Sequence, residues 1–286
     1  METKYSRIIN KEEIEKYINT TDFISMFCND IKSKCKSVLD PFKDHTFTYD
    51  IDESTIIGLY TKLYKYSTIA LEAYGSKNYD LITLLSRPSY EVLVLIKYLI
   101  LRGKESQRHY RLVSYRRRFK NYELQKEYEG IGDVLRNKTE YALSVDGFTF
   151  EDLERENKKT KGRKWALDGK TFQQIHNEVE IQETYSHVYG PMSETIHSGW
   201  GDIRQLHLTH CEGDFFVPNI EFYNKTDLRL LNPILAFMLE GGESILKWNK
   251  RSEELPMICE LTRVNNLMTE YILEIYITDP DNYLYN

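Results

Sequence analysis

The stretch "LLSRPSYEVLVLIKYLI", residues 84–100, decides the fold class of this chain. From Val92 to Leu101 it is apolar at nearly every position except Lys97, which is typical of a helix at the centre of a bundle. The apolar run is far shorter than the roughly 20 residues that cross a bilayer. It therefore predicts a central helix over residues 79–102 in a protein without a membrane span.

Outward from this helix, apolar residues recur at helical spacing in seven further segments. These are residues 11–39, 53–77, 104–130, 171–189, 191–199, 227–249 and 255–277. Residues 210–227 alternate like a short strand, and the charged residues 139–170 predict a surface excursion. We expect an all-α bundle with N-terminal helices (1–52), a helical core that carries the candidate site (53–210), and a C-terminal part (211–286) with a short extended segment and an accessory helical pair.

Composition and motifs exclude several classes of protein. The net charge of −6 means that an anionic partner needs a local basic patch. The four cysteines form no CxxC pair and the N-terminus lacks the apolar segment of a signal peptide, so we expect reduced thiols in the cytoplasm. HExxH, GxxxxGK[ST], GxGxxG and GxSxG are all missing, so we expect no metal and no cofactor.

One carboxylate lies inside the apolar stripe of the 79–102 helix. At 100° per residue, Glu91 falls among the positions of the stripe, with Arg87 four residues before it. The stripe consists of Leu81, Leu84, Pro88, Leu95 and Leu99. We expect Glu91 to be largely desolvated and paired with Arg87. Two interpretations stay open, a structural ion pair and a polar pocket completed by another helix.

A second stretch, "YSHVYGPMSETIHSGW" at residues 185–200, places two further polar side chains one helical turn apart. Ser193 and His197 are i,i+4 neighbours beside an apolar stripe, and Gly190-Pro191 either kinks the helix or restarts it. Histidine titrates in the range suited to proton transfer, and a serine hydroxyl can hydrogen-bond to it. The alternative is a partly buried histidine with a structural hydrogen bond.

These stretches together resemble a bacterial family catalogued as domain of unknown function 5677. The resemblance covers about residues 60–205 and also includes "GRKWALDGKTFQQI", residues 162–175. Its pattern of Arg-x-x-x-Glu, a tryptophan after a basic loop, and a Tyr/Tyr/Ser/His series spaced by four falls on Arg87, Glu91, Trp165, Tyr185, Tyr189, Ser193 and His197. The resemblance implies an all-α core in which Glu91 and His197 face each other, and it names no reaction.

A more distant resemblance is to the helical nucleotide-binding superfamily called HEPN. Many of its members are metal-independent ribonucleases of defence and toxin systems that use an Arg-x(4–6)-His motif. The stretch "RQLHLTH", from Arg204 to His210, fits that spacing but lies beyond the Trp200-Gly201 break. We interpret this match as a coincidence of a short pattern.

Basic charge gathers in the segment from Lys97 to Lys120, which has nine Lys or Arg and one acidic residue. Tyrosines and Phe119 interleave with the arginines, a composition typical of contact with single-stranded nucleic acid. The candidate RNA-binding residues are Arg108, Arg111, Arg116, Arg117, Arg118 and Lys120. The alternative is a solvated helix face whose aromatic rings pack inward.

Two functions remain open. In the first, the chain is a HEPN-like, RNA-directed effector of bacterial antiviral defence or of a toxin system, and a candidate metal-independent endoribonuclease. His197 would act as general acid and base, and Arg87 as the partner of the phosphate or of the transition-state charge. Glu91 would orient one of them, and Ser193 is the fourth catalytic candidate. In the second, the chain is a non-catalytic helical module that binds a protein partner. In both cases we expect a homodimer that does not bind membranes.

Overall fold

The structure is a computed structural model that describes residues 4–18, 20, 22–39, 49–160, 167–197, 200, 203–204, 207–211, 215–219 and 228–278. The chain forms two compact units, and the boundary between them falls within two long helices. Unit 1 takes residues 1–46, 59–96 and 182–286, and unit 2 takes residues 47–58 and 97–181. These units differ from the predicted division at residues 52 and 210.

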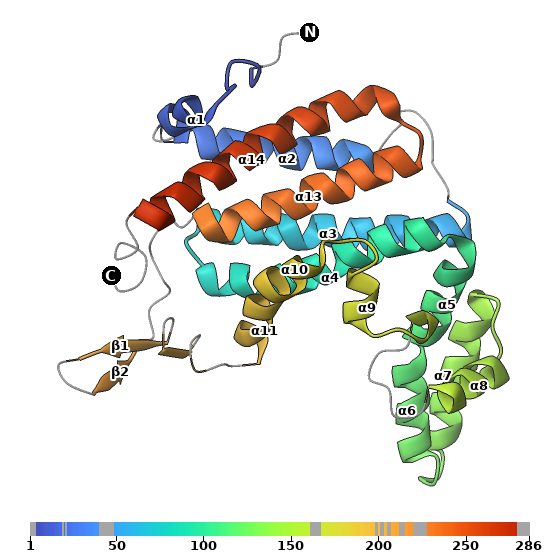
Figure 1. Ribbon diagram of the computed structural model, residues 1–286. Helices are drawn as coiled ribbons and strands as arrows, with labels where there is room; N and C mark the ends of the chain where they lie inside the picture. Colours follow the sequence, from blue (N-terminus) through green and yellow to red (C-terminus); the bar gives the residue numbers. More distant parts are fainter. Residues whose placement is uncertain are drawn as a thin grey trace. The chain divides into compact units, whose positions relative to one another are not determined.

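Unit 1 is a layered arrangement of helices with a small hairpin (Figure 1). Its helices are α1 (Lys11–Ile18), α2 (Phe23–Leu39), residues 59–75 of α3 (Ile51–Gly75), residues 79–96 of α4 (Tyr79–Arg102), α10 (Gln182–Thr184), α11 (Gly190–Ile196), α13 (Leu228–Trp248) and α14 (Leu255–Thr278). A π-helical turn η2 (Tyr185–Tyr189) joins α10 to α11, and a 3-10 turn η3 (Ser252–Glu254) precedes α14. The strands β1 (Leu208–His210) and β2 (Phe216–Pro218) pair antiparallel.

The core of unit 1 forms around α13, which packs on α2 and α14. Gly241 and Gly242 let α13 approach α3 closely, since a Cβ at Gly241 would lie 2.6 Å from the Leu63 side chain. The Tyr90 ring of α4 packs on Phe237 of α13 at 5.2 Å between ring centroids. Close approach at the glycines and ring packing beside them therefore hold α3 and α4 on the same helix.

The orientation of α4 differs from the one that its apolar stripe predicts. Ser86 and Ser89 are buried, whereas Leu84 is 50% exposed and the Glu91 side chain is 36% exposed. The predicted desolvation of Glu91 is therefore wrong. Small hydroxyl side chains occupy the core-facing positions because they fit between closely packed helices, and their polarity hides those positions from a hydrophobic pattern.

Unit 2 has a separate core. Its elements are α5 (Lys104–Ser114), α6 (Arg116–Gln125), α7 (Ile131–Val145), α8 (Phe150–Lys159), a 3-10 turn η1 (Leu167–Gly169) and α9 (Phe172–His176), together with the ends of α3 and α4. The core consists of the buried residues Leu112, Leu143, Phe148, Phe150 and Leu153, with Tyr115, Phe119 and Tyr122 packed against them. The N-terminus of α8 has a capping box, in which Thr149 and Asp152 bond each other's backbone N–H groups.

The all-α prediction is confirmed, with two local corrections. Residues 139–145 and 150–159 of the predicted surface excursion belong to the helices α7 and α8, which contribute side chains to a core. The predicted extended segment exists as the β1–β2 hairpin, although its first strand begins two residues before residue 210. Within the described residues, no helix combines the length and hydropathy that a membrane span needs.

Candidate functional site

Arg87 is the centre of a polar cluster in unit 1. Residues 87 and 91 lie one turn apart on α4, so the Arg87 Nε donates to Glu91 Oε1 at 3.0 Å. The Arg87 side chain is only 17% exposed, whereas Glu91 keeps contact with water. The ion pair therefore holds the guanidinium in place and leaves its Nη1 and Nη2 groups for other partners.

The other partners come from the segment η2–α11. The Arg87 Nη2 donates to the Tyr189 hydroxyl at 2.7 Å, and Nη1 donates to Ser193 Oγ at 3.0 Å. The His197 Nε2 lies 3.1 Å from the same Nη1. Tyr189 in turn donates to Glu91 Oε1 at 2.9 Å. We call these five residues the Arg87 cluster.

Helical spacing explains why one guanidinium reaches three side chains of a single segment. Residues 189, 193 and 197 are four apart and therefore lie along one face of the helix. The Tyr185 and Tyr189 rings stack at 4.9 Å, and the Arg87 Cζ lies 4.8 Å from the Tyr189 ring centroid. The turn that contains both tyrosines is π-helical, a rare geometry that is frequent at functional sites.

The charges of the cluster follow from its contacts. Burial alone would lower the pKa of Arg87, but the hydrogen bonds and charges of Glu91 and Tyr189 raise it above its ordinary value. Burial and the Glu91 carboxylate raise the pKa of Tyr189 to about 12, so this hydroxyl stays protonated near neutral pH. Arginine has donors only, so the contact with Nη1 assigns His197 Nε2 as an acceptor, with the ring proton on Nδ1.

The structure thus brings together all four predicted catalytic candidates, Arg87, Glu91, Ser193 and His197. It places them at the surface of unit 1, with the His197 side chain exposed, and not in the bundle interior. Tyr189 was missed as a member of the site. The resemblance had placed it in the series spaced by four that ends at His197, but it was not among the catalytic candidates.

A second polar cluster, in unit 2, was not predicted. The Asp168 carboxylate accepts from Tyr98 at 2.8 Å and from Ser106 at 2.6 Å, and its Oδ1 lies 2.8 Å from His109 Nδ1. The other ring nitrogen of His109 lies 3.2 Å from the Glu156 carboxylate. Burial would raise the pKa of Asp168, but the hydrogen bonds from Ser106, His109 and Tyr98 outweigh burial and lower it. We call these five residues the Asp168 cluster.

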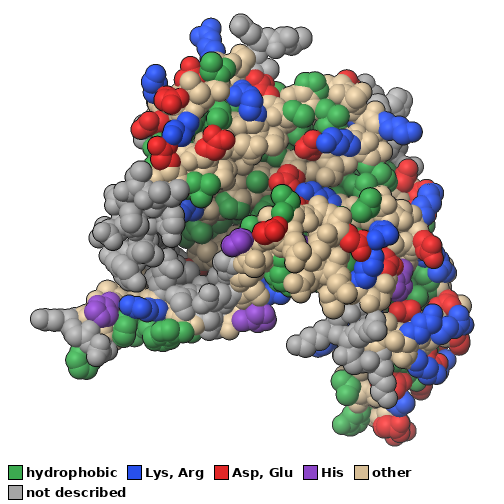
Figure 2. All heavy atoms as spheres, in the orientation of Figure 1, with side chains coloured by type: hydrophobic (Ala, Val, Ile, Leu, Met, Phe, Trp, Pro, Cys, Tyr) green, Lys and Arg blue, Asp and Glu red, His purple; other side chains and the backbone are tan. Residues whose placement is uncertain are grey.

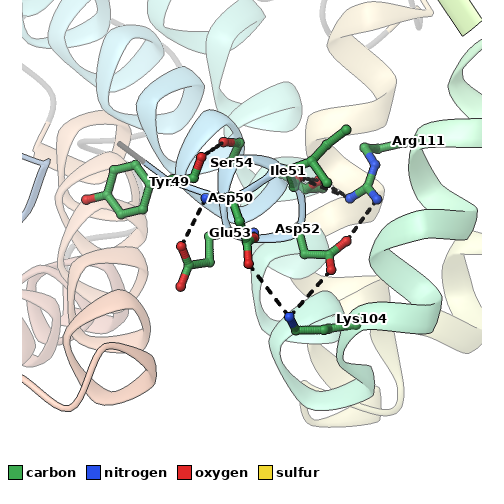
Figure 3. A network of polar contacts seen from close by, with 9 residues as sticks. Tyr49, Asp50, Ile51, Asp52, Glu53, Ser54, Lys104 and Arg111 are labelled. Carbon is green, nitrogen blue, oxygen red and sulfur yellow. Dashed lines mark hydrogen bonds and ion pairs between the residues drawn. The ribbon is translucent and has the colours of Figure 1, made fainter. Parts of the chain in front are cut away.

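Two of the six predicted RNA-binding residues are directed into unit 2. Arg111 donates to the Ile51 carbonyl, the Thr55 hydroxyl and the Asp52 carboxylate, so it is held at the N-terminal turn of α3 (Figure 3). Arg116 is 9% exposed and donates to the Thr160 carbonyl at 3.3 Å. Both side chains bind backbone carbonyls of their own unit, so these guanidinium groups already have partners within it.

The four remaining candidates, Arg108, Arg117, Arg118 and Lys120, are exposed. The aromatic residues beside them are not, because Tyr115, Phe119 and Tyr122 pack on the core of unit 2. In Figure 2, acidic side chains also stand among the basic ones along the edge of this unit. The exposed surface therefore offers cations for phosphates but does not present these rings for base stacking.

Arg204 and His210 do not share one helix, since His210 ends strand β1. Trp165 lies outside the described residues. Among the residues that the structure describes, no group of three or more His, Cys, Asp or Glu side chains is placed to hold a metal ion.

Comparison with known protein families gives a match over the segment that carries the Arg87 cluster. Residues 52–216 match the model of a family described as "Family of unknown function (DUF5677)". No curated protein and no solved structure matches the chain. The matched segment contains every residue of the Arg87 cluster and covers more than half of the chain, so the chain belongs to this family of unknown function.

Proposed function

We propose that the chain is an RNA-directed effector of the HEPN-like type, acting in the cytoplasm in bacterial defence or in a toxin system, and that the Arg87 cluster cleaves RNA without a metal. The observation that supports this proposal is the contact between Arg87 Nη1 and His197 Nε2, 3.1 Å apart at the surface of unit 1. A fixed cation and an acceptor nitrogen at that distance suit a phosphate and its neighbouring hydroxyl.

In the proposed reaction, a phosphate oxygen of RNA accepts a hydrogen bond from Arg87 Nη1 and so replaces Ser193 and His197 as partners of this group. The freed Nε2 of His197 accepts the proton of the ribose 2′-hydroxyl. The 2′-oxygen then forms a bond to phosphorus, and the bond from phosphorus to the 5′-oxygen breaks. The 5′-oxygen takes up the proton that His197 accepted, which returns the imidazole to its neutral form. The products are a 2′,3′-cyclic phosphate and a 5′-hydroxyl.

The remaining residues of the cluster would orient the guanidinium. Glu91 holds Nε and Tyr189 holds Nη2, so the charge of Arg87 is fixed in direction before substrate arrives. Such preorganisation matters because a donor that is already aimed at the developing charge needs no rearrangement during the reaction. The exposed Arg117, Arg118 and Lys120 would supply attraction to the RNA backbone.

A second candidate is a non-catalytic module that binds a protein partner. It is favoured by the fact that Arg87 already has four side-chain partners, Glu91, Tyr189, Ser193 and His197. A guanidinium satisfied in this way can serve to fasten α11 to α4. In that case His197 has no chemical role.

The test is cleavage of end-labelled single-stranded RNA at low salt, with EDTA present, by the full chain and by its His197→Ala variant. We expect the wild-type protein to produce a 2′,3′-cyclic phosphate and the variant to bind RNA without cleaving it. His187→Ala is the matched control, because this exposed histidine lies in the neighbouring π-helical turn and outside the cluster.

A separate variant with Glu in place of Arg117, Arg118 and Lys120 should bind RNA more weakly and with a smaller salt dependence. A wild-type protein that neither binds nor cleaves RNA would exclude the effector and leave the partner-binding module. Binding without cleavage would leave an RNA adaptor.

A further inference from the structure

Helix α7 (Ile131–Val145) of unit 2 is apolar on two opposite sides. Its inner side is buried at Gly132, Thr139 and Leu143. On the opposite side, four large apolar residues are exposed by 47%, 50%, 74% and 65%, namely Ile131, Val134, Tyr141 and Val145. A helix that is apolar on opposite sides is usually covered on both. The outer side of α7 therefore has the composition of a contact surface.

The spacing of this outer side is that of a helix-pairing seam. Positions 131, 134, 138, 141 and 145 are separated by three, four, three and four residues, which places them along one narrow stripe. Leu124 and Tyr128, just before α7, are 76% and 63% exposed. Hydrophobic side chains reach the surface at the lower end of the α6 and α7 pair in Figure 2. We call the five positions 131, 134, 138, 141 and 145 the α7 seam.

The seam is held in a fixed orientation. A Cβ at Gly132 would lie 2.8 Å from the carbonyl oxygen of Lys126, so α7 packs against the preceding turn with no space to spare. About three turns further along the helix, the buried Leu143 holds the same side of α7 against the core. Because α7 cannot rotate without breaking these contacts, the seam is presented outward in a single orientation, which lowers the entropy cost of binding.

The central position of the seam is charged. Lys138 is exposed and has no ion-pair partner within the described part of the chain. Its neighbour Arg136 is paired with Glu140 at 2.7 Å and also lies over the Phe150 ring, away from the seam. The seam thus offers four apolar contacts around one unpaired cation.

This charge argues against a second copy of the chain as the occupant. A symmetric pairing of two seams about their centre, whether parallel or antiparallel, places Lys138 opposite Lys138. Like charges inside an apolar interface disfavour such a pair, and a single polar residue in a seam selects the partner that can satisfy it. A carboxylate opposite Lys138 would form an ion pair in either direction of approach, since position 138 is the middle one.

We propose that the α7 seam binds an amphipathic helix of another protein, which contributes aliphatic side chains along the seam and one carboxylate opposite Lys138. This site is separate from the Arg87 cluster and does not depend on RNA cleavage. The carboxylate supplies the choice of partner, and the four apolar contacts supply most of the affinity.

The test uses the full chain and two synthetic helical peptides of about 21 residues, three heptads. Both peptides carry leucine at the seam-facing positions, and they differ only at the central one, which is Glu in the first and Lys in the second. Fluorescence anisotropy of labelled peptide should show that the Glu peptide binds at least about tenfold more tightly. The variant Lys138→Glu should reverse this preference, and Tyr141→Ser should weaken binding of both peptides.

Arg136→Glu is the matched control, since it makes the same charge change on the same helix but away from the seam, and it should leave the preference unchanged. Circular dichroism should show that all variants keep the wild-type helix content. Equal binding of the two peptides, or binding of neither, would overturn the proposal. So would a wild-type dimer in sedimentation that Tyr141→Ser dissociates, or binding to phosphatidylglycerol vesicles that requires Tyr141.

Discussion

The Arg87 cluster of unit 1 and the Asp168 cluster of unit 2 contain similar groups in opposite arrangements. Each has one histidine, at least one carboxylate, one serine and one tyrosine. In unit 2, both ring nitrogens of His109 face carboxylates, and the Glu156 partner is 9% exposed. In unit 1, His197 is exposed and its Nε2 contacts the guanidinium of Arg87.

This difference separates a structural cluster, which holds helices together, from a candidate reactive site. The Asp168 cluster joins α4, α5, α8 and η1 through a carboxylate that Tyr98, Ser106 and His109 all contact. The Arg87 cluster joins two segments through a donor and leaves histidine and serine at the surface. The two clusters therefore cannot be distinguished by the residue types they contain. They differ in how many of their polar groups remain accessible to a substrate.

The largest expected effect is on the Asp168 cluster. Asp168→Ala removes the carboxylate that accepts from Tyr98 and Ser106 and contacts His109, and it places alanine at a left-handed φ of 51°. We expect the free energy of unfolding of unit 2 to fall by about 3 kcal/mol. Amide hydrogen exchange should show faster exchange in α5 and α8, with α13 of unit 1 as the internal reference.

Asp168→Asn is the control for that variant, since asparagine tolerates the left-handed conformation and keeps one acceptor oxygen. It should cost less than the alanine variant. Equal losses for both variants would mean that the carboxylate itself holds the cluster, and no loss for either would show that the cluster does not fasten unit 2.

Acid should act on the same cluster with a smaller effect, because protonation weakens the contacts of Asp168 without deleting the side chain. The folded-state pKa of Asp168 is lowered, so it lies below the unfolded value of about 3.9. The contribution to stability is complete above the unfolded pKa and is lost as pH falls through the folded pKa. Urea unfolding below pH about 4 should show a loss in the wild type that is reduced in Asp168→Ala.

The sequence predicted the long helices well because their burial is apolar and periodic. It missed α7 and α8. In α8, Phe150 and Leu153 are the only large apolar residues on the buried side. Its one other buried position is the polar Glu156. The capping box of Thr149 and Asp152 was the available local indication of this helix.

The candidate site was predicted in part, for a comparable reason. Spacing by four relates residues of one helix, so it could pair Arg87 with Glu91 and Ser193 with His197. It could not show that the two pairs meet, because that contact joins residues 106 and 110 positions apart. The rotation of α4 was missed because the buried Ser86 and Ser89 are polar.

In the Arg87 cluster, Arg87→Ala should have a moderate effect. Removal of the guanidinium takes away the ion-pair partner of Glu91, but this carboxylate keeps the hydrogen bond from Tyr189, is 36% exposed and can regain water. We expect a loss of about 1 kcal/mol in the free energy of unfolding, measured by urea denaturation. A loss of about 3 kcal/mol or more would instead show that Glu91 is desolvated and that the two clusters are energetically alike.

Titration at alkaline pH should show how strongly the Glu91 carboxylate raises the pKa of Tyr189 in the Arg87 cluster. The pKa of Tyr189 is raised to about 12 from an unfolded value of about 10. Its contribution to stability is therefore complete below pH about 10 and is lost as pH rises toward 12. The ultraviolet titration difference between wild type and Tyr189→Phe should have its midpoint near pH 12. In a Glu91→Gln background the midpoint should move toward 10, and an unmoved midpoint would mean that burial alone raises the pKa.

The smallest expected effect on stability belongs to His197→Ala, and it decides what the comparison means. The side chain is exposed and its one described side-chain contact is to Arg87, which keeps three other partners without it. The free energy of unfolding should therefore change by no more than about 0.5 kcal/mol. Ser193→Ala, which removes a neighbouring contact of the same nitrogen, is the matched control.

If His197→Ala lowers the free energy of unfolding by well over 1 kcal/mol, His197 holds α11 in place just as His109 stabilises unit 2. A loss of RNA cleavage in that variant would then say nothing about chemistry. If stability is unchanged and cleavage is lost, the exposed nitrogen acts on the substrate, and the difference between the two clusters is one of function.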